Sequence, residues 1–192
     1  GTYTLTLPPT GTGAEYTNLD GDLDIMSDLN IIGAGSSNTI IQAGTLGYPD
    51  AGANGIDGVF QISSNYYGAP AITVTFSGVT IRNGRNPVWG SGGGIAMLAS
   101  SHLFLTNSVL TGNDTTGVGG AIQAWGGSIY IIQSTFSNNR SQWGGAIYLQ
   151  SNAYLFVTGS SFVDNLAYNI NGGGALSISG TADISNSTFA NN

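Results

Sequence analysis

The chain has 192 residues and a formal net charge of −7, with three cationic side chains, one His and no Cys. Three cations are too few to neutralise a phosphate backbone, so we expect no nucleic-acid partner, and the absence of Cys excludes disulfides and thiol chemistry. No apolar run is long enough to cross a bilayer, so we expect no membrane insertion of this segment. With 31 Gly and 41% hydrophobic residues, the composition is typical of an ordered, repetitive protein.

Residues 1–71 predict short β-strands at irregular spacing. Apolar and polar residues alternate over 2–7 and 22–32, and short apolar runs follow at 39–41 and 59–62. Alternation with a period of two indicates strands with one buried face. The Pro8-Pro9 pair and the Gly-rich stretch 44–58 predict loops between these strands.

From residue 72 onward the chain repeats itself. A nine-residue phrase of the type ISNSTFANN occupies 105–113, 131–139, 157–165 and 184–192, and a looser copy occupies 76–84. The four close copies start 26, 26 and 27 residues apart. A second element, a Gly-Gly pair followed by a small and an aliphatic residue, lies between the phrases at 92–95, 119–122, 144–147 and 173–176. Two markers that share one period indicate a repeat architecture.

Each period contains about three short strands, too few to bury an apolar face by themselves. Stacking the periods solves this problem, because each coil then supplies the backbone hydrogen bonds of its neighbour at the strand spacing of ~4.8 Å. The sequence therefore predicts an all-β, single-domain parallel β-helix over residues 1–192. We expect about seven coils of roughly 26 residues, irregular over 1–71 and regular over 72–192.

The repeated phrase predicts two columns of like residues inside this solenoid. One frame position should form an apolar stack, and the last position should form a ladder of amides that hydrogen-bond from coil to coil. The apolar stack would contain Ile81, Leu110, Phe136, Phe162 and Phe189. The amide ladder would contain Asn113, Asn139, Asn165 and Asn192. The Gly pairs would mark sharp bends where neighbouring backbones approach closely or φ is positive.

Several phrases carry a family resemblance. GTYTLTL at 1–7, GDLDI at 21–25, DLNIIGAG at 28–35 and VTIRNG at 79–84, together with alternating GGAI and STFSNN, resemble the right-handed parallel β-helix repeat proteins of bacterial surfaces. The chain is most similar to large secreted proteins that carry a CSLREA motif, and more distantly to the chlamydial polymorphic outer-membrane proteins. The resemblance implies a right-handed solenoid and a prokaryotic extracellular or cell-surface location, and it implies no catalytic motif.

In the resembled proteins the TYTLTL strand usually follows a segment with the CSLREA helix, which would cap the solenoid. That segment does not precede Gly1, and Asn192 falls within a coil. We therefore expect two uncapped ends that expose strand edges and apolar core. Covering one end with the other end of a second copy would generate an open, head-to-tail filament.

Asp20, Asp22 and Asp24 are the only candidate metal ligands, as a weak Ca²⁺ site or as the acidic cluster of a polysaccharide lyase. The alternative interpretation, which we favour, is the solvent face of an ordinary strand, because alternate residues of a strand point the same way. A lyase also needs a basic group near its acids, and the Arg residues lie coils away. His102 has no recognisable partners, so the sequence offers no catalytic residues and no cofactor site.

Two further sets of residues are candidates for binding or modification. Trp89, Trp125 and Trp143 fall in loops or beside Gly-rich bends, where they could pack on the solenoid wall, contact another subunit or bind sugar rings. Asn113, Asn139 and Asn186 lie in N-x-S/T sequons. We expect the first two amides to be occupied inside the ladder, so Asn186 is the better glycosylation acceptor.

These observations favour a non-enzymatic extracellular structural protein, the subunit of a cell-surface filament, sheath or adhesive stalk. Its expected partner is a second copy of the same chain, stacked end to end, with surface glycans as a further candidate. The alternative is a polysaccharide-active enzyme, of lyase or hydrolase type, or a glycan-binding adhesin or passenger domain on the same fold.

Overall fold

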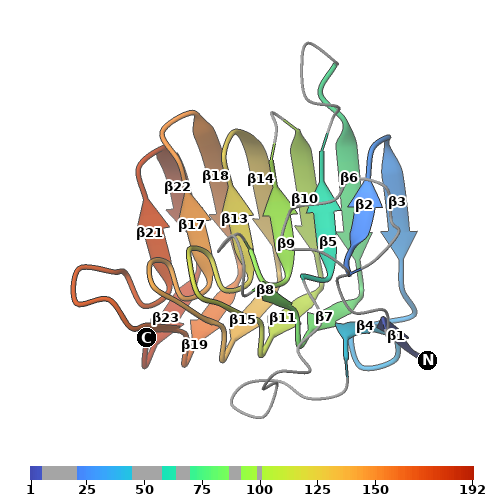
Figure 1. Ribbon diagram of the computed structural model, residues 1–192, viewed down its shortest axis with the longest axis horizontal. Helices are drawn as coiled ribbons and strands as arrows, with labels where there is room; N and C mark the ends of the chain where they lie inside the picture. Colours follow the sequence, from blue (N-terminus) through green and yellow to red (C-terminus); the bar gives the residue numbers. More distant parts are fainter. Residues whose placement is uncertain (6–20, 45–57, 64–69, 87–91, 99–100) are drawn as a thin grey trace.

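The computed structural model describes residues 1–5, 21–44, 58–63, 70–86, 92–98 and 101–192. All regular secondary structure in these residues is β-strand, and every strand pair between coils is parallel. The strands form four sheets that run along the long axis of the molecule, from the N-terminal coil at one end to the C-terminal coil at the other (Figure 1). The prediction of an all-β parallel solenoid is therefore confirmed.

We name the sheets A to D. Sheet A contains β1 (Thr2–Leu5), β4 (Ile40–Ala43), β7 (Thr80–Arg82), β11 (Val109–Thr111), β15 (Thr135–Ser137), β19 (Ser161–Val163) and β23 (Thr188–Ala190). Sheet B contains β2 (Leu23–Ile25), β5 (Phe60–Ile62), β9 (Ile95–Met97), β13 (Ile122–Ala124), β17 (Ile147–Leu149) and β21 (Leu176–Ile178). Sheet C contains β3 (Leu29–Ile32), β6 (Thr73–Ser77), β10 (His102–Thr106), β14 (Gly127–Ile132), β18 (Ala153–Thr158) and β22 (Thr181–Ser185). Sheet D contains β8 (Arg85–Asn86), β12 (Asp114–Thr115), β16 (Arg140–Ser141) and β20 (Leu166–Ala167).

A regular coil passes through sheets C, A, D and B in that order. The expected three strands per coil correspond to sheets C, A and B, whereas sheet D was not expected. Its strands are two residues long, too short for an alternating pattern to reveal them. In the described residues sheet D has four strands, so the solenoid with all four sheets is about four turns long. Sheet A, with seven strands, is the only sheet that matches the expected seven coils.

The core fills the space between the sheets with the inward residues of each strand. In β10, β14 and β18 every second residue is fully buried, for example Leu103, Ile129 and Leu155. The residues on either side of each of these point outward. The register between coils aligns similar side chains, since Leu103 pairs with Ile129 and Ile129 pairs with Leu155. The result is one continuous apolar cluster from Ile25 to Ala175.

The predicted apolar stack in sheet A is confirmed. Consecutive members are direct strand partners, from Ile81 through Leu110 to Phe189. The Phe136 and Phe162 rings lie 4.8 Å apart with 8° between their planes, and Phe162 and Phe189 repeat this geometry at 4.8 Å and 5°. The members are fully buried except Phe189, which is 43% exposed in the last coil.

The predicted amide ladder is also confirmed, and it bonds to the backbone as well. Asn113 donates from Nδ2 to Asn139 Oδ1 at 3.0 Å, and its backbone N donates to the same oxygen at 3.1 Å. Asn139 binds Asn165 in this way, and Asn165 binds Asn192. Each Nδ2 also donates to a carbonyl of the preceding coil, as Asn139 does to Leu110 at 2.9 Å. Backbone Gly84 N–H donates to Asn113 Oδ1 and closes the other end of the ladder.

Two kinds of backbone constraint turn the chain between the sheets. The corners on either side of sheet A hold columns of left-handed residues, for example Asn107 and Asn138 with φ of 50° and 54°. In the Gly-Gly pairs, Gly119 and Gly144 have φ of 68° and 65°. The second Gly of each pair lies against the next coil: a Cβ on Gly120 would meet the Gly145 carbonyl oxygen at 2.2 Å. Positive φ and close backbone approach thus occur together in the pairs at 119–120 and 144–145, whereas the pairs at 92–93 and 173–174 show the close approach alone.

We predict that Asn139→Ala destabilises the fold by roughly 3 kcal/mol or more, because buried donors and acceptors lose partners at about 1–3 kcal/mol each. The Nδ2 and backbone N of Asn113 lose their shared acceptor, and the Leu110 carbonyl loses a donor. Urea unfolding followed by circular dichroism measures the change. Asn152→Ala, at an exposed turn, is the matched control and should change stability by less than about 0.5 kcal/mol. Equal effects of the two substitutions would contradict the role of the ladder.

Candidate functional site

Sheet D brings together charged and polar side chains from successive coils. Strand register places Asp114 directly between Arg85 of the preceding coil and Arg140 of the following coil. Two of the three cations in the chain therefore flank one carboxylate. The amide ladder positions the start of two strands of sheet D. Asn113 and Asn139, which are hydrogen-bonded in the ladder, directly precede β12 and β16.

Asp114 is 7% exposed. Arg85 Nε lies 3.7 Å from Asp114 Oδ2, which is an ion pair at the edge of the usual range. Burial raises the pKa of the Asp114 carboxyl above its ordinary value of 3.8. The positive charges of Arg85 and Arg140 oppose this shift without cancelling it.

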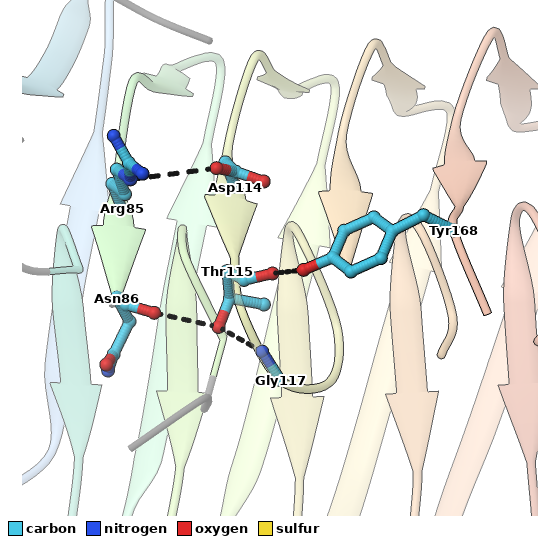
Figure 2. A network of polar contacts seen from close by, with 6 residues as sticks. All are labelled: Arg85, Asn86, Asp114, Thr115, Gly117 and Tyr168. Atoms are coloured by element: carbon cyan, nitrogen blue, oxygen red, sulfur yellow. Dashed lines mark hydrogen bonds and ion pairs between the residues drawn. The ribbon is translucent and has the colours of Figure 1, made fainter. Parts of the chain in front are cut away.

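Tyr168 covers this group from the C-terminal side. Its ring lies under the Arg140 guanidinium, with the Arg140 Cζ 5.1 Å from the ring centroid, a cation–π contact. Its hydroxyl donates to the Thr115 carbonyl oxygen at 2.8 Å, so the side chain reaches back across the intervening coil (Figure 2). Burial raises the pKa of the Tyr168 hydroxyl, and the Asp114 charge raises it further.

The Thr115 hydroxyl extends the network toward the N-terminal side. It donates to the Asn86 carbonyl oxygen at 3.0 Å and accepts from the Gly117 backbone N–H at 3.2 Å (Figure 2). Asn86, Thr115 and Tyr168 thus connect strands β8 and β12 to the segment after β20. This network ties successive coils together along the axis.

The group is an ion cluster whose charged members come from three successive coils. Hydrolysis by two carboxylates needs a second acid at ~5 to 10 Å, and the strand partners of Asp114 are both Arg. No group of three or more His, Cys, Asp or Glu residues in the described ranges could hold a metal ion. The Arg residues were considered from the sequence only against Asp20, Asp22 and Asp24, so the position of Arg85 and Arg140 on either side of Asp114 was not predicted. Residues 85, 114 and 140 are one repeat apart, so their spacing carried the signal.

Of the acidic residues near the N-terminus, Asp24 and Asp28 make separate contacts. Asp24 Oδ1 accepts a hydrogen bond from Gln61 Nε2 at 2.8 Å, and Asp28 Oδ1 accepts one from the Thr73 backbone N–H at 2.7 Å. Asp22 lies just before β2, and Asp20 lies outside the described residues. Asp24 and Asp28 therefore bond to the next coil, as structural carboxylates do.

The two Trp residues that the structure describes do not form one platform. Trp125 follows β13 and is 46% exposed, whereas Trp143 precedes β17 and is half-buried, so they lie at opposite ends of the strands of sheet B. The Val118–Trp143 backbone bridge holds the latter. Trp89 lies outside the described residues.

An aromatic column that was not predicted from the sequence lies on the outer face of sheet C. The Phe104 and Tyr130 rings stack at 4.7 Å with 8° between their planes, and Phe156 follows at 6.3 Å from Tyr130. Their spacing of 26 residues is that of the repeat. The Phe104 and Tyr130 rings cover each other's faces, so a sugar ring cannot stack between them. Beside the column, a hydrogen bond to Asp183 at 2.6 Å raises the pKa of the Tyr154 hydroxyl.

The sequons differ in accessibility. Asn113 and Asn139 are fully buried, and their amides bond within the ladder. Asn186 lies exposed at the corner between β22 and β23 with φ of 47°. Among the three sequon residues, only Asn186 is exposed. His102, the first residue of β10, is also exposed.

A family model described as a right-handed β-helix region matches residues 57–192. The chain belongs to this right-handed β-helix family. Comparisons with the curated proteins and with the solved structures give no significant match. The matched residues include sheet D and the whole amide ladder, so the candidate site is part of the right-handed β-helix itself. No helix in the described residues is long and apolar enough to span a membrane.

We predict that Asp114→Asn removes one component of the pH dependence of stability. Burial makes the folded state hold this proton more tightly than the unfolded state, so protonation stabilises the right-handed β-helix. The stabilisation is complete below the ordinary value of 3.8 and disappears as the pH rises through the raised folded-state pKa. Urea unfolding of both proteins at about pH 4 and about pH 7 measures it.

The unfolding free energy of the wild type minus that of the variant should decrease from about pH 4 to about pH 7. Other carboxylates titrate equally in both proteins and cancel in this difference. A difference that stays constant or rises with pH would contradict the effect of burial on Asp114.

Proposed function

We propose that the protein is a non-enzymatic structural subunit of an extracellular, cell-surface filament, sheath or adhesive stalk. The observation that carries the proposal is the use of charged groups as ties between coils. Asp24, Asp114 and Asp183 each contact a side chain of a neighbouring coil. Catalysis requires acids and bases that are free to exchange protons with a substrate.

The columns of like residues support the same proposal. Stacked Phe rings, stacked amides and a shared backbone register give each coil the same contacts as the next. Stability in such a solenoid is a sum of nearest-neighbour terms, and the rod can be lengthened by adding coils. A stalk or filament requires such a rod, in which every coil makes the same contacts with the next. The resemblance to bacterial surface proteins supports the extracellular, prokaryotic location.

The partner that we propose is a second copy stacked along the solenoid axis. Every described coil pairs with the next through parallel strands, as β18 pairs with β22 and β19 with β23. A second copy would repeat these contacts at its junction, because inward positions carry like residues from coil to coil: Ile184 is the strand partner of the buried Val157.

We predict that the native protein forms rods in negative-stain microscopy and sediments as a polydisperse assembly. Ile184→Asp should dissociate the rods, because it places a charge in the apolar contact between coils. Thr106→Asp adds the same charge to the outer face of β10 and should leave the rods intact. Monodisperse monomers in the native sample would contradict end-to-end assembly. Turnover of a glycan that Asp114→Asn abolishes would contradict the non-enzymatic role.

A further inference from the structure

The outer face of sheet B carries a buried amide that the fold leaves without partners. Ile122 and Ala124 belong to the apolar cluster, so the side chain of Gln123 between them points away from the core. Gln123 is fully buried, and within the described part of the chain neither its Oε1 nor its Nε2 has a hydrogen-bond partner. An unpartnered buried amide destabilises a folded chain, so it marks a position that a ligand can complete.

Two further side chains of the same face lie beside this amide. The strands β9, β13 and β17 run side by side (Figure 1), and their register continues beyond their ends. The Trp125 N–H donates to the Met97 carbonyl, and the Gln150 N–H donates to the Ala124 carbonyl. Trp125 and Gln150 are therefore neighbours on adjacent coils, at the strand spacing of ~4.8 Å. Trp125 also lies two residues, roughly 6.6 Å, along the strand from Gln123.

These neighbours offer an aromatic surface and a second acceptor. The Trp125 side chain is 46% exposed, so its indole is accessible at the rim. Gln150 is half-buried, and its Oε1 is a buried atom with no hydrogen-bond partner among the described residues. Tyr148, the strand partner of Gln123 on the following coil, is half-buried. The face thus combines two unsatisfied amides with an exposed indole.

The unpartnered atoms define the chemical group that fits. The Oε1 of Gln123 needs a donor and its Nε2 needs an acceptor, and a hydroxyl supplies both. A carboxylate has no proton for Oε1, and an ammonium group has no acceptor for Nε2. The strands β9, β13 and β17 contain no Asp, Glu, Lys or Arg, so they provide no partner for a charged ligand. The ligand is therefore neutral and carries hydroxyl groups.

We propose that Gln123, Trp125 and Gln150 form a binding site for a neutral saccharide on the outer face of sheet B. One sugar hydroxyl accepts from Nε2 of Gln123 and donates to its Oε1, and a second hydroxyl donates to Oε1 of Gln150. The sugar ring stacks on the exposed indole of Trp125. The inference goes beyond the proposed function, because a site on the wall of the solenoid does not depend on end-to-end stacking.

Isothermal titration calorimetry of the intact protein tests the site. The neutral probes are cellohexaose, maltohexaose, mannohexaose and chitohexaose. Hexagalacturonate is the charged comparison, and sorbitol supplies hydroxyls without a ring. We expect saturable binding of at least one neutral hexasaccharide and at least ~10-fold weaker binding of hexagalacturonate and sorbitol.

Three variants separate the site from a merely structural role. Gln123→Met keeps the length of the side chain and removes both polar atoms, so it should weaken binding at least ~10-fold without lowering the unfolding free energy. Trp125→Ala should also weaken binding at least ~10-fold. Gln61→Met is the matched control on the same sheet, two coils away. Because Gln61 donates to Asp24 at 2.8 Å, this variant should lose stability and keep its affinity for the sugar.

A lack of saturable binding to all the neutral probes would overturn the proposal. Binding that Gln123→Met leaves unchanged would do the same, and so would equal binding of hexagalacturonate or sorbitol. The site and the proposed function fail separately. Rods that bind no sugar would remove the site alone, and sugar binding by monomers would remove the end-to-end assembly alone.

Discussion

The parallel pairing of each coil with the next is the constraint on which the rest of the structure depends. No coil can satisfy its own backbone donors and acceptors, so every strand must align with its neighbours in one register. The Asn ladder fixes that register, because Asn113, Asn139 and Asn165 each bind the backbone of one coil and the amide of the next. A shift by one residue would move each amide away from the next and unpair all of them at once.

Once the register is fixed, the unusual composition has a physical explanation. Neighbouring backbones come so close at the bends that Gly120 and Gly145 leave no space for a Cβ. Like residues stack on like, so columns of equal charge would repel. In sheet D the signs alternate along the column, from Arg85 through Asp114 to Arg140. Few charges and many Gly residues are therefore requirements of the stacking, not signs of a weak core.

Much of the fold could be predicted from the sequence because the repeat places identical residue types in identical positions. The stack of Phe136 and Phe162 and the ladder of Asn139 and Asn165 follow from that identity alone. The ion cluster of sheet D was missed because its column mixes residue types, so self-similarity does not reveal it, although its spacing does. The Trp residues could not be placed, because loop conformation depends on contacts that the repeat does not encode. Among candidate sites, sequence reasoning thus located the structural columns and missed the polar network.

The same columns connect structure to the proposed role, since a rod that transmits force needs equal contacts at every step. Residue-resolved hydrogen exchange of the native protein tests the central claim about these contacts most directly. The account predicts that the backbone amides of Asn113, Asn139 and Asn165 exchange together, only through global unfolding, and far more slowly than the exposed turn at Asn152. Exchange of the three ladder amides at unrelated rates, or as fast as that of Asn152, would contradict it.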